Sequence, residues 1–541
     1  MTGEDDSMKE KMLALLLAAA MLTALAGCGN GSAGEGAPTS DGQKAAETSP
    51  GDAGEDAPAT LIYGSGDYTR INPALDEHGE INLLIFDGLT AHDGDNEVVP
   101  ALASRWDYDA DTYTYTFYLR EGVTWHDGEP FTADDVKFTI EAVMDPENAS
   151  ENAADFEDVE EITVVDAQTI SFRLSAPNAA FTHYMSMPVL PRHLLEGEDM
   201  QTSDFFRSPV GTGPYRLVSW DAGAAITLER NEDYFKGAAK LERIIFKIVP
   251  DDNARALQMR TGELDLAQLA PRDAANFADD EAYRVYEMTT SDYRGILFNF
   301  ANAYWQKNRD LIPAVCYGID RDAIVKTVLL GQGMSAYGPL QSNPYDYADV
   351  EHYDYSPENA RSVLEEAGCV QETDGFYYRG GEKVGFTISV SAGDQVRLDM
   401  AQIAAQQLRE IGMDVRVDVP AQIDWGAQEA YLIGWGSPFD ADDHTYKVFG
   451  TNKGANYSSY SNEAVDMYLR QARESEDEAV RREAYANFQK ALADDPPFAF
   501  ICYIDADYVA KAGLSGIDGH TVMGHHGVGI FWNVTEWEFL Q

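Results

Sequence analysis

An α/β fold organised in two lobes is predicted for this 541-residue chain from three observations. Residues 386–419 alternate as a strand, then follow helical spacing, then alternate again, which is the βαβ pattern of an α/β layer. Residues 111–120 alternate with period two much earlier in the chain. About 480 residues follow the N-terminal segment, a length that divides into two or three domains.

Residues 1–28 predict a lipoprotein signal peptide. The first seven residues are acidic, whereas Met8-Lys9-Glu10-Lys11 makes a basic start, so we take Met8 as the initiator. The apolar run 12–26 is shorter than the about 20 residues that span a bilayer. It ends in Leu25-Ala26-Gly27-Cys28, which resembles the lipobox whose cysteine becomes lipidated. An ordinary signal peptide with an incidental cysteine is the alternative.

Residues 29–59 predict a disordered tether. They are rich in Gly, Ala, Ser, Glu, Asp and Pro and contain no aromatic residue. Such a segment cannot bury enough apolar surface to order itself. We expect it to hold the folded part away from a membrane to which acyl chains on Cys28 anchor the protein.

The composition narrows the classes of function. A formal charge of -53 argues against nucleic-acid binding and favours solubility. Hydrophobic residues at 44% and aromatic residues at 11% are typical of a globular body. After Cys28 only Cys316, Cys369 and Cys502 remain. Three cysteines cannot all pair within one chain, so we expect buried thiols rather than a disulfide framework, with a single bridge left open.

The elements of the first lobe begin with the strand at residues 111–120. Its predicted buried face is Tyr113, Tyr115, Phe117 and Leu119. His126-Asp127-Gly128 follows, and we interpret it as a turn rather than as a metal or acid–base pair. A helix then begins after Thr132, with Asp135 placed for a capping box and with an apolar stripe of Val136, Ile140 and Val143.

The second lobe contains the βαβ unit. Phe386, Ile388 and Val390 alternate, a helix runs through Met400 to Ile411, and Gly412 ends it. Residues 413–419 form the next strand, and the crossover should be right-handed. Residues 462–472 and 475–493 predict two further amphipathic helices.

These elements suggest borders for the two lobes. We expect an N-terminal lobe at residues 60–290, with an inserted subdomain at 100–208. The second lobe spans residues 291–504, and residues 505–541 return to the first. The chain would therefore cross between the lobes near Thr290 and near Asp505.

Several motifs occur in the order and spacing of one family over nearly all of residues 60–505. They are Trp125-His126-Asp127-Gly128, Gly211-Thr212-Gly213-Pro214-Tyr215, Gly262-Glu263 with Asp265, Ile319-Asp320-Arg321, and Ser356-Pro357-Glu358-Asn359-Ala360. In this the chain resembles the extracellular solute-binding proteins of family 5, which serve peptide and nickel ABC importers.

The resemblance implies a bilobal clamp of the periplasmic-binding-protein type, with two mixed-sheet lobes and an inserted subdomain in the first. Such a clamp closes on its ligand and docks on a permease driven by ATPase subunits. Ligand contacts to both lobes would shift the population toward the closed state. We therefore expect a monomeric, lipid-anchored extracytoplasmic protein without a cofactor that delivers small peptides. A nickel or metal-chelate ligand is the alternative.

In the second lobe the resemblance points to the segment Gly434-Trp435-Gly436-Ser437-Pro438-Phe439-Asp440. Peptide binders usually carry an Asp-Tyr pair where this chain has Pro438-Phe439, and the pattern is more like the nickel-binding branch. It implies that Trp435 and Phe439 line the cavity. The histidine of that branch has no counterpart around residues 452–454. Asp440 is expected to bind a ligand ammonium group or to cap a helix near residues 442–448.

Other candidates lie outside this segment. His78 and Glu80 belong to a stretch that borders the cleft in the family. Tyr293 and Arg294 lie at the predicted crossing, where Arg294 would hold a ligand carboxylate or form a structural salt bridge. His520, His525 and His526 are either metal ligands or part of a glycine-rich surface loop.

Two other classes of function are alternatives. A hydrolase is disfavoured because the chain has no His-Glu-x-x-His, Gly-x-Ser-x-Gly or Cys-x-x-Cys motif. A ligand-sensing lipoprotein would share the same fold and would differ in its membrane partner. The sequence therefore predicts a binding protein and not an enzyme.

Overall fold

The computed structural model describes residues 59–540, apart from 77–78, 342, 344, 346–349, 351 and 525–528. The described residues belong to one compact unit, residues 58–541. The predicted signal peptide and tether, with Cys28, lie outside the described residues. Within the described part of the chain, no helix has the length and apolar character needed to cross a membrane.

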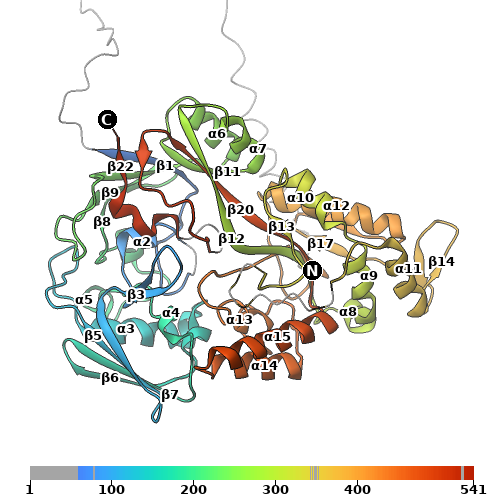
Figure 1. Ribbon diagram of the computed structural model, residues 1–541, viewed down its shortest axis with the longest axis horizontal. Helices are drawn as coiled ribbons and strands as arrows, with labels where there is room; N and C mark the ends of the chain where they lie inside the picture. The colour runs from blue at the N-terminus through green and yellow to red at the C-terminus, as the bar shows by residue number, and fades with distance from the viewer. Residues whose placement is uncertain are drawn as a thin grey trace, which may run out of the picture. The chain divides into compact units, whose positions relative to one another are not determined.

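A single mixed sheet of eleven strands organises this unit (Figure 1). Its centre is the antiparallel pair β12 (Tyr283–Phe298) and β20 (Phe498–Lys511). Beyond β12 come β19 (Ala430–Ile433), β17 (Thr387–Ser389) and β18 (Arg416–Asp418). Beyond β20 come β11 (Leu266–Leu269), β1 (Thr60–Ser65), β10 (Arg243–Ile248), β9 (Ala225–Arg230) and β8 (Tyr215–Asp221), while β13 (Met334–Ser335) also pairs with β20.

Both parallel and antiparallel neighbours occur in this sheet. β1 runs parallel to β10 and β11, and β17 runs parallel to β18 and β19. The pairs β12–β20, β10–β9 and β8–β9 are antiparallel. The predicted mixed α/β class is therefore confirmed.

Two large hydrophobic cores pack on this sheet. The first core draws its buried residues from 61–288 and 506–537, and the second core draws them from 293–503. The change from one core to the other occurs on β12 at a break in register between Thr289 and Tyr293, opposite Asp505 and Tyr503 of β20. The lobe and subdomain borders given by the sequence stay a prediction.

A separate four-stranded sheet belongs to the first core. Its order is β4 (Ala103–Asp109), β5 (Thr114–Leu119), β7 (Thr169–Leu174) and β6 (Val159–Asp166). Tyr115, Phe117 and Leu119 are buried as predicted. The prediction for Tyr113 is wrong, because its φ of 52° places it in a turn before β5 and its side chain is 37% exposed.

The predicted helix of this region is confirmed as α3 (Ala133–Met144). Its capping box is formed, with the Thr132 N–H donating to Asp135 Oδ2 over 2.9 Å. Val136, Ile140 and Val143 are buried. His126 packs nearby in the predicted turn: Gly211 N–H donates to its Nδ1 over 3.2 Å, and its Nε2 lies 3.0 Å from the Gly213 carbonyl oxygen. The His126 ring therefore fixes the loop at residues 211–213 and has a structural role.

The predicted βαβ unit is also confirmed. β17 and β18 are parallel and flank α12 (Gln395–Ile411), which ends at Gly412 with a φ of 103°. The two later helices are α14 (Glu463–Arg473) and α15 (Glu478–Asp494), which lie side by side in Figure 1. Cys316, Cys369 and Cys502 are buried free thiols, as expected.

The remaining elements connect these units. They are α2 (Asn82–Ile85), α4 (Phe181–Tyr184), α5 (Arg192–Leu195), α6 (Asp252–Arg260), α7 (Pro271–Ala274), α8 (Ala303–Asn308), α9 (Ile312–Tyr317), α10 (Arg321–Val328), α11 (Pro357–Glu366), α13 (Tyr446–Phe449), β2 (Thr90–His92), β3 (Val98–Pro100), β14 (Val370–Gln371), β15 (Tyr377–Arg379), β16 (Glu382–Lys383), β21 (Leu514–Ser515) and β22 (Glu538–Phe539).

The loop after β19 lies directly on β12, and this contact generates a prediction. A Cβ atom on Gly434 would lie 1.5 Å from the Tyr293 carbonyl oxygen, so no side chain fits there. Gly434→Ala should lower the free energy of unfolding by at least the about 1–3 kcal/mol of an overpacked core. Urea unfolding measures this difference. Gly454→Ala is the control, because a Cβ atom at that position would have nothing within 4 Å, and equal midpoints for the two variants would contradict the prediction.

Candidate functional site

A cavity of about 310 Å³ lies between the first core and the loop at residues 436–447 of the second core. Its other walls come mainly from residues 73–76, 79–93, 183–188, 234–236, 521–524 and 529–535. The volume is at the lower end of the roughly 300–1,000 Å³ typical of small-molecule pockets. We call this cavity the cleft.

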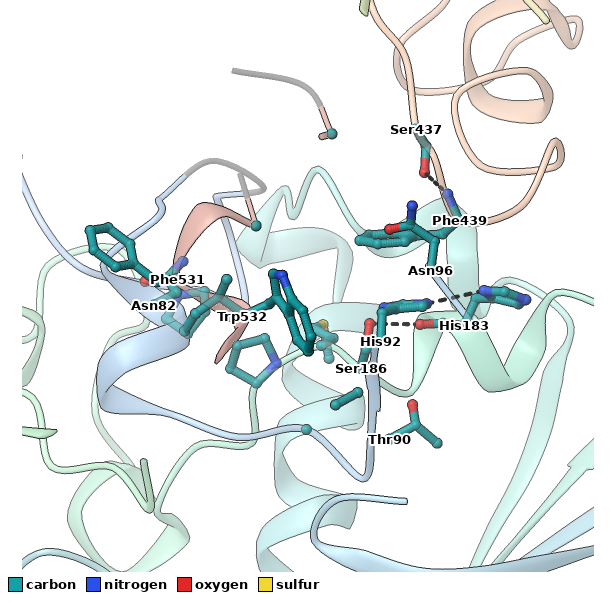
Figure 2. A pocket seen from close by; sticks show the side chains of 18 of the residues that line it. Asn82, Thr90, His92, Asn96, His183, Ser186, Ser437, Phe439, Phe531 and Trp532 are labelled. Atoms are coloured by element: carbon teal, nitrogen blue, oxygen red, sulfur yellow. Dashed lines mark hydrogen bonds between the residues drawn. The ribbon is translucent and has the colours of Figure 1, made fainter. Parts of the chain in front are cut away.

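Aromatic rings from the two sides of the cleft meet across it. The Phe439 ring stacks on the His92 imidazole, with centroids 3.6 Å apart and planes 7° from parallel. His92 Nε2 lies 3.1 Å from Nδ1 of His183. Figure 2 draws this contact as a dashed line between the two side chains. Burial, reinforced by His183, lowers the pKa of His92 to about 3, so this imidazole is neutral at physiological pH. The cleft is therefore closed on this side by a stack of neutral rings.

The cleft has apolar walls with separate polar groups. Leu83, Phe86, Met187, Phe531 and Trp532 supply apolar surface from the first core. Asn82, Asn96, Asp87, Tyr234 and Lys236 supply polar groups on the same side. This combination suits a ligand that carries both an apolar part and a few hydrogen-bonding groups.

Asp440 lies beside the cleft, but its carboxylate is already paired. Arg481 Nη2 donates to both of its oxygens, over 2.7 and 2.6 Å, and Asp442 N–H donates to Oδ1 over 2.8 Å. Asp440 is 7% exposed. Asp440 is therefore held by Arg481 and by its own turn, and it does not cap α13 (Tyr446–Phe449), whose N-cap residue is Thr445. Its role toward a ligand ammonium stays a prediction.

Of the other second-lobe candidates, Phe439 lines the cleft and Trp435 does not. Trp435 packs inside the second core, with its ring centroid 5.9 Å from Tyr457 and 6.1 Å from Phe498. Tyr293 is also buried in that core and is 1% exposed. Neither residue is among those that line the cleft.

Glu80 and Arg294 share a second cavity of about 550 Å³ beside β12 and β20. Arg294 Nη2 donates to Asp292 Oδ2 over 2.8 Å, which is the structural salt bridge that the sequence offered as one alternative. Tyr63 donates its hydroxyl to Glu80 Oε2 over 2.9 Å. Burial raises the pKa of Glu80 to about 7.

The histidine candidates do not form a described metal site. His78, His525 and His526 lie outside the described residues, and His520 is exposed. Within the described ranges, no group of three or more His, Cys, Asp or Glu side chains is arranged to hold a metal ion.

Charged side chains bridge the two cores at one end of the cleft. Lys453 Nζ lies 2.6 Å from Glu157 Oε1, and Arg473 Nε lies 3.2 Å from Asp158 Oδ2. Tyr184 also donates its hydroxyl to Asp442. These pairs join the neighbourhood of β6 to that of α13 and α14.

Sequence reasoning missed most of the cleft. His92, His183, Asp87 and Trp532 had no periodicity or motif that set them apart, and they lie on segments widely separated in the chain. The one available signal was Asp87, which directly follows the apolar residues 83–86. A charged side chain in an apolar run needs a partner or a function.

The molecule has an α/β fold with two cores, and an apolar cleft covered by stacked rings lies between them. This arrangement is typical of ligand-binding proteins that act as a clamp. Comparison with known proteins agrees. Residues 97–457 match the model of the bacterial extracellular solute-binding proteins, family 5. Protein XP55 of Streptomyces lividans is 34% identical over 86% of this chain and 87% of its own. Oligopeptide-binding protein AppA of Bacillus subtilis is 26% identical over 87% of this chain and 91% of its own.

A solved structure extends the likeness. NikZ from Campylobacter jejuni, in complex with Ni(L-His), superposes with a TM-score of 0.85 at 34% identity, over 89% of this chain and all of that one. This chain belongs to the bacterial extracellular solute-binding proteins of family 5. Its fold is the bilobal clamp of that family, as the sequence motifs implied.

The buried pair of Asp440 and Arg481 generates a prediction for stability. Arg481→Met would leave the Asp440 carboxylate buried without its cation, which typically costs about 3–5 kcal/mol. Chemical unfolding at pH 7 measures the loss. Arg482→Met is the matched control, because the neighbouring Arg482 is exposed and pairs with Glu478 on the surface. An equal decrease in the free energy of unfolding for both variants would show that the buried pair stabilises the fold no more than the surface pair does.

Proposed function

We propose that this protein is the substrate-binding component of an ABC importer and delivers small peptides to a permease with ATPase subunits. The observation that carries the proposal is the contact between Phe439 and His92, which closes a cleft whose walls belong to different cores. A solute held there touches both cores, so it favours the closed form by its differential affinity. The protein acts without catalysis and as a monomer.

The size and chemistry of the cleft support a short peptide. A volume of about 310 Å³ suits a ligand of a few residues. The apolar walls suit the side chains of a short peptide, and the isolated polar groups suit its backbone N–H and carbonyl groups. The relative AppA is named as an oligopeptide-binding protein, which supports the same ligand class.

A metal chelate is the second candidate. His92 and His183 line the cleft, and the structural relative NikZ holds Ni(L-His). Since the described residues offer no cluster of three ligand side chains, a metal would have to arrive with a chelator that supplies most of its donor atoms. The cleft would then recognise the chelator as much as the metal.

Thermal unfolding with a panel of solutes tests this function. The panel contains di- to hexapeptides, nickel, nickel with histidine, and sugars. A ligand at 100 times its Kd should add about 2.7 kcal/mol of stability. We expect peptides to raise the Tm and to be recovered intact by mass spectrometry. A shift with nickel and histidine alone would favour the chelate, and cleavage of a bound peptide would favour a hydrolase.

We also propose that the protein is a lipoprotein anchored at the extracytoplasmic face of the cell membrane through Cys28. Leu25-Ala26-Gly27-Cys28 and the short apolar run before it support this proposal. Cys28→Ser should move the expressed protein out of the membrane fraction, because the site of acylation is lost. Cys369→Ser, a change at a buried thiol, should leave it there. Equal fractionation of both variants would rule out this anchor.

A further inference from the structure

Asp87 is a buried carboxylate on the wall of the cleft. It lies just after α2, its side chain is 8% exposed, and it belongs to the first core's side of the cavity. Tyr234 donates its hydroxyl to Oδ1 over 2.9 Å, and Thr212 donates its hydroxyl to Oδ2 over 3.2 Å. Two neutral hydroxyl groups therefore orient the carboxylate and do not cancel its charge.

The charge of Asp87 is weakly compensated. Lys236 is its salt-bridge partner among the described residues, with Nζ 3.8 Å from Oδ1, beyond hydrogen-bonding distance, on a side chain that is 38% exposed. Burial raises the pKa of Asp87, and the more distant Lys236 offsets this only in part. Asp440, by contrast, receives two short hydrogen bonds from Arg481. A buried carboxylate whose charge is only partly compensated is stabilised when a second cation binds close to it.

The other carboxylates of the cleft are already engaged. Asp76 is paired with Arg70 through two bonds of 2.8 Å. Asp443 and Asp155 share the buried Lys447, whose Nζ lies 3.0 Å from Asp443 Oδ1 and 3.8 Å from Asp155 Oδ2 on a side chain that is only 5% exposed. Asp93 accepts two backbone N–H groups of its own turn. Asp87 is therefore the carboxylate best placed to receive a charge from a ligand.

We infer that Asp87 binds the protonated amino group of the ligand, so the importer selects short peptides with a free amino terminus. The inference rests on the proposed peptide function. It places the ammonium site on the first core, whereas the candidate that the sequence offered for it, Asp440, lies on the second. Lys236 can swing toward solvent as the ligand ammonium takes its place, and the nearby apolar walls receive the first side chain.

A comparison of free and blocked peptides tests this inference. The probes are a mixture of di- to tetrapeptides and the same mixture after N-acetylation. The readout is the concentration that half-saturates the rise in Tm of the full chain. A charge-assisted hydrogen bond predicts that acetylation weakens binding to the wild type roughly 10- to 100-fold. Asp87→Asn, which keeps acceptor and donor atoms for Tyr234 and Thr212, should bind both mixtures equally and weakly.

Two further variants separate a ligand role from a structural one. Asp233→Asn removes an exposed carboxylate next to Tyr234 but outside the cleft lining, and it should keep the preference for free amines. Lys236→Met removes the competing ammonium and should keep or increase that preference. If Asp87→Asn does not fold, a reduced preference in Lys236→Met overturns the inference by itself.

The outcomes distinguish the two proposals. Binding of both mixtures with equal strength by the wild type, or a preference that survives Asp87→Asn, overturns the role of Asp87 and leaves the peptide function standing. Binding of neither mixture overturns the peptide function and the inference with it. Loss of the preference in Asp87→Asn alone supports both.

Discussion

The pairing of β12 with β20 is the interaction on which the rest of the molecule depends. The two strands pair from Tyr283 opposite Lys511 to Leu297 opposite Phe498. Both strands contribute to both cores: Met288 and Tyr508 lie in the first core, and Ile296 and Tyr503 in the second. Both cores pack on the same hydrogen-bonded pair of strands. The geometry of the cleft between the cores therefore depends on the pairing of β12 with β20.

The register break in β12 also positions the second wall of the cleft. Near residues 289–293 the strand leaves the regular ladder, and the Gly434 to Gly436 loop approaches its carbonyl groups closely. Tyr293 N–H donates to the Trp435 carbonyl over 2.9 Å. The loop is thus held before it reaches Phe439, so a ring from the second core can meet His92. This explains why Trp435 itself lies in the second core and not on the wall of the cleft.

The net charge of the chain says little about the chemistry of its cleft. Although the chain carries a formal charge of -53, acids near the cleft differ greatly in how they are compensated. Asp440 has a full guanidinium partner and Glu157 a lysine, whereas Asp87 has two hydroxyl groups and a more distant ammonium. Local pairing in a place of low dielectric, and not the global field, decides which carboxylate can take a ligand charge.

The sequence by itself determined the elements whose signals are local. The capping box of α3, the stop of α12 at Gly412 and the alternation of β5 each depend on residues within a few positions of one another, and each was predicted. The prediction for Tyr113 was wrong because the alternating pattern starts before the strand does. Tyr113 lies in a turn, and β5 begins at Thr114. Only the tertiary structure decided that Asp440 pairs with Arg481, that His92 meets His183 and Phe439, and that Asp87 faces the cleft. These contacts join residues far apart in the chain, and their partners are chosen by packing and burial, which no local pattern records.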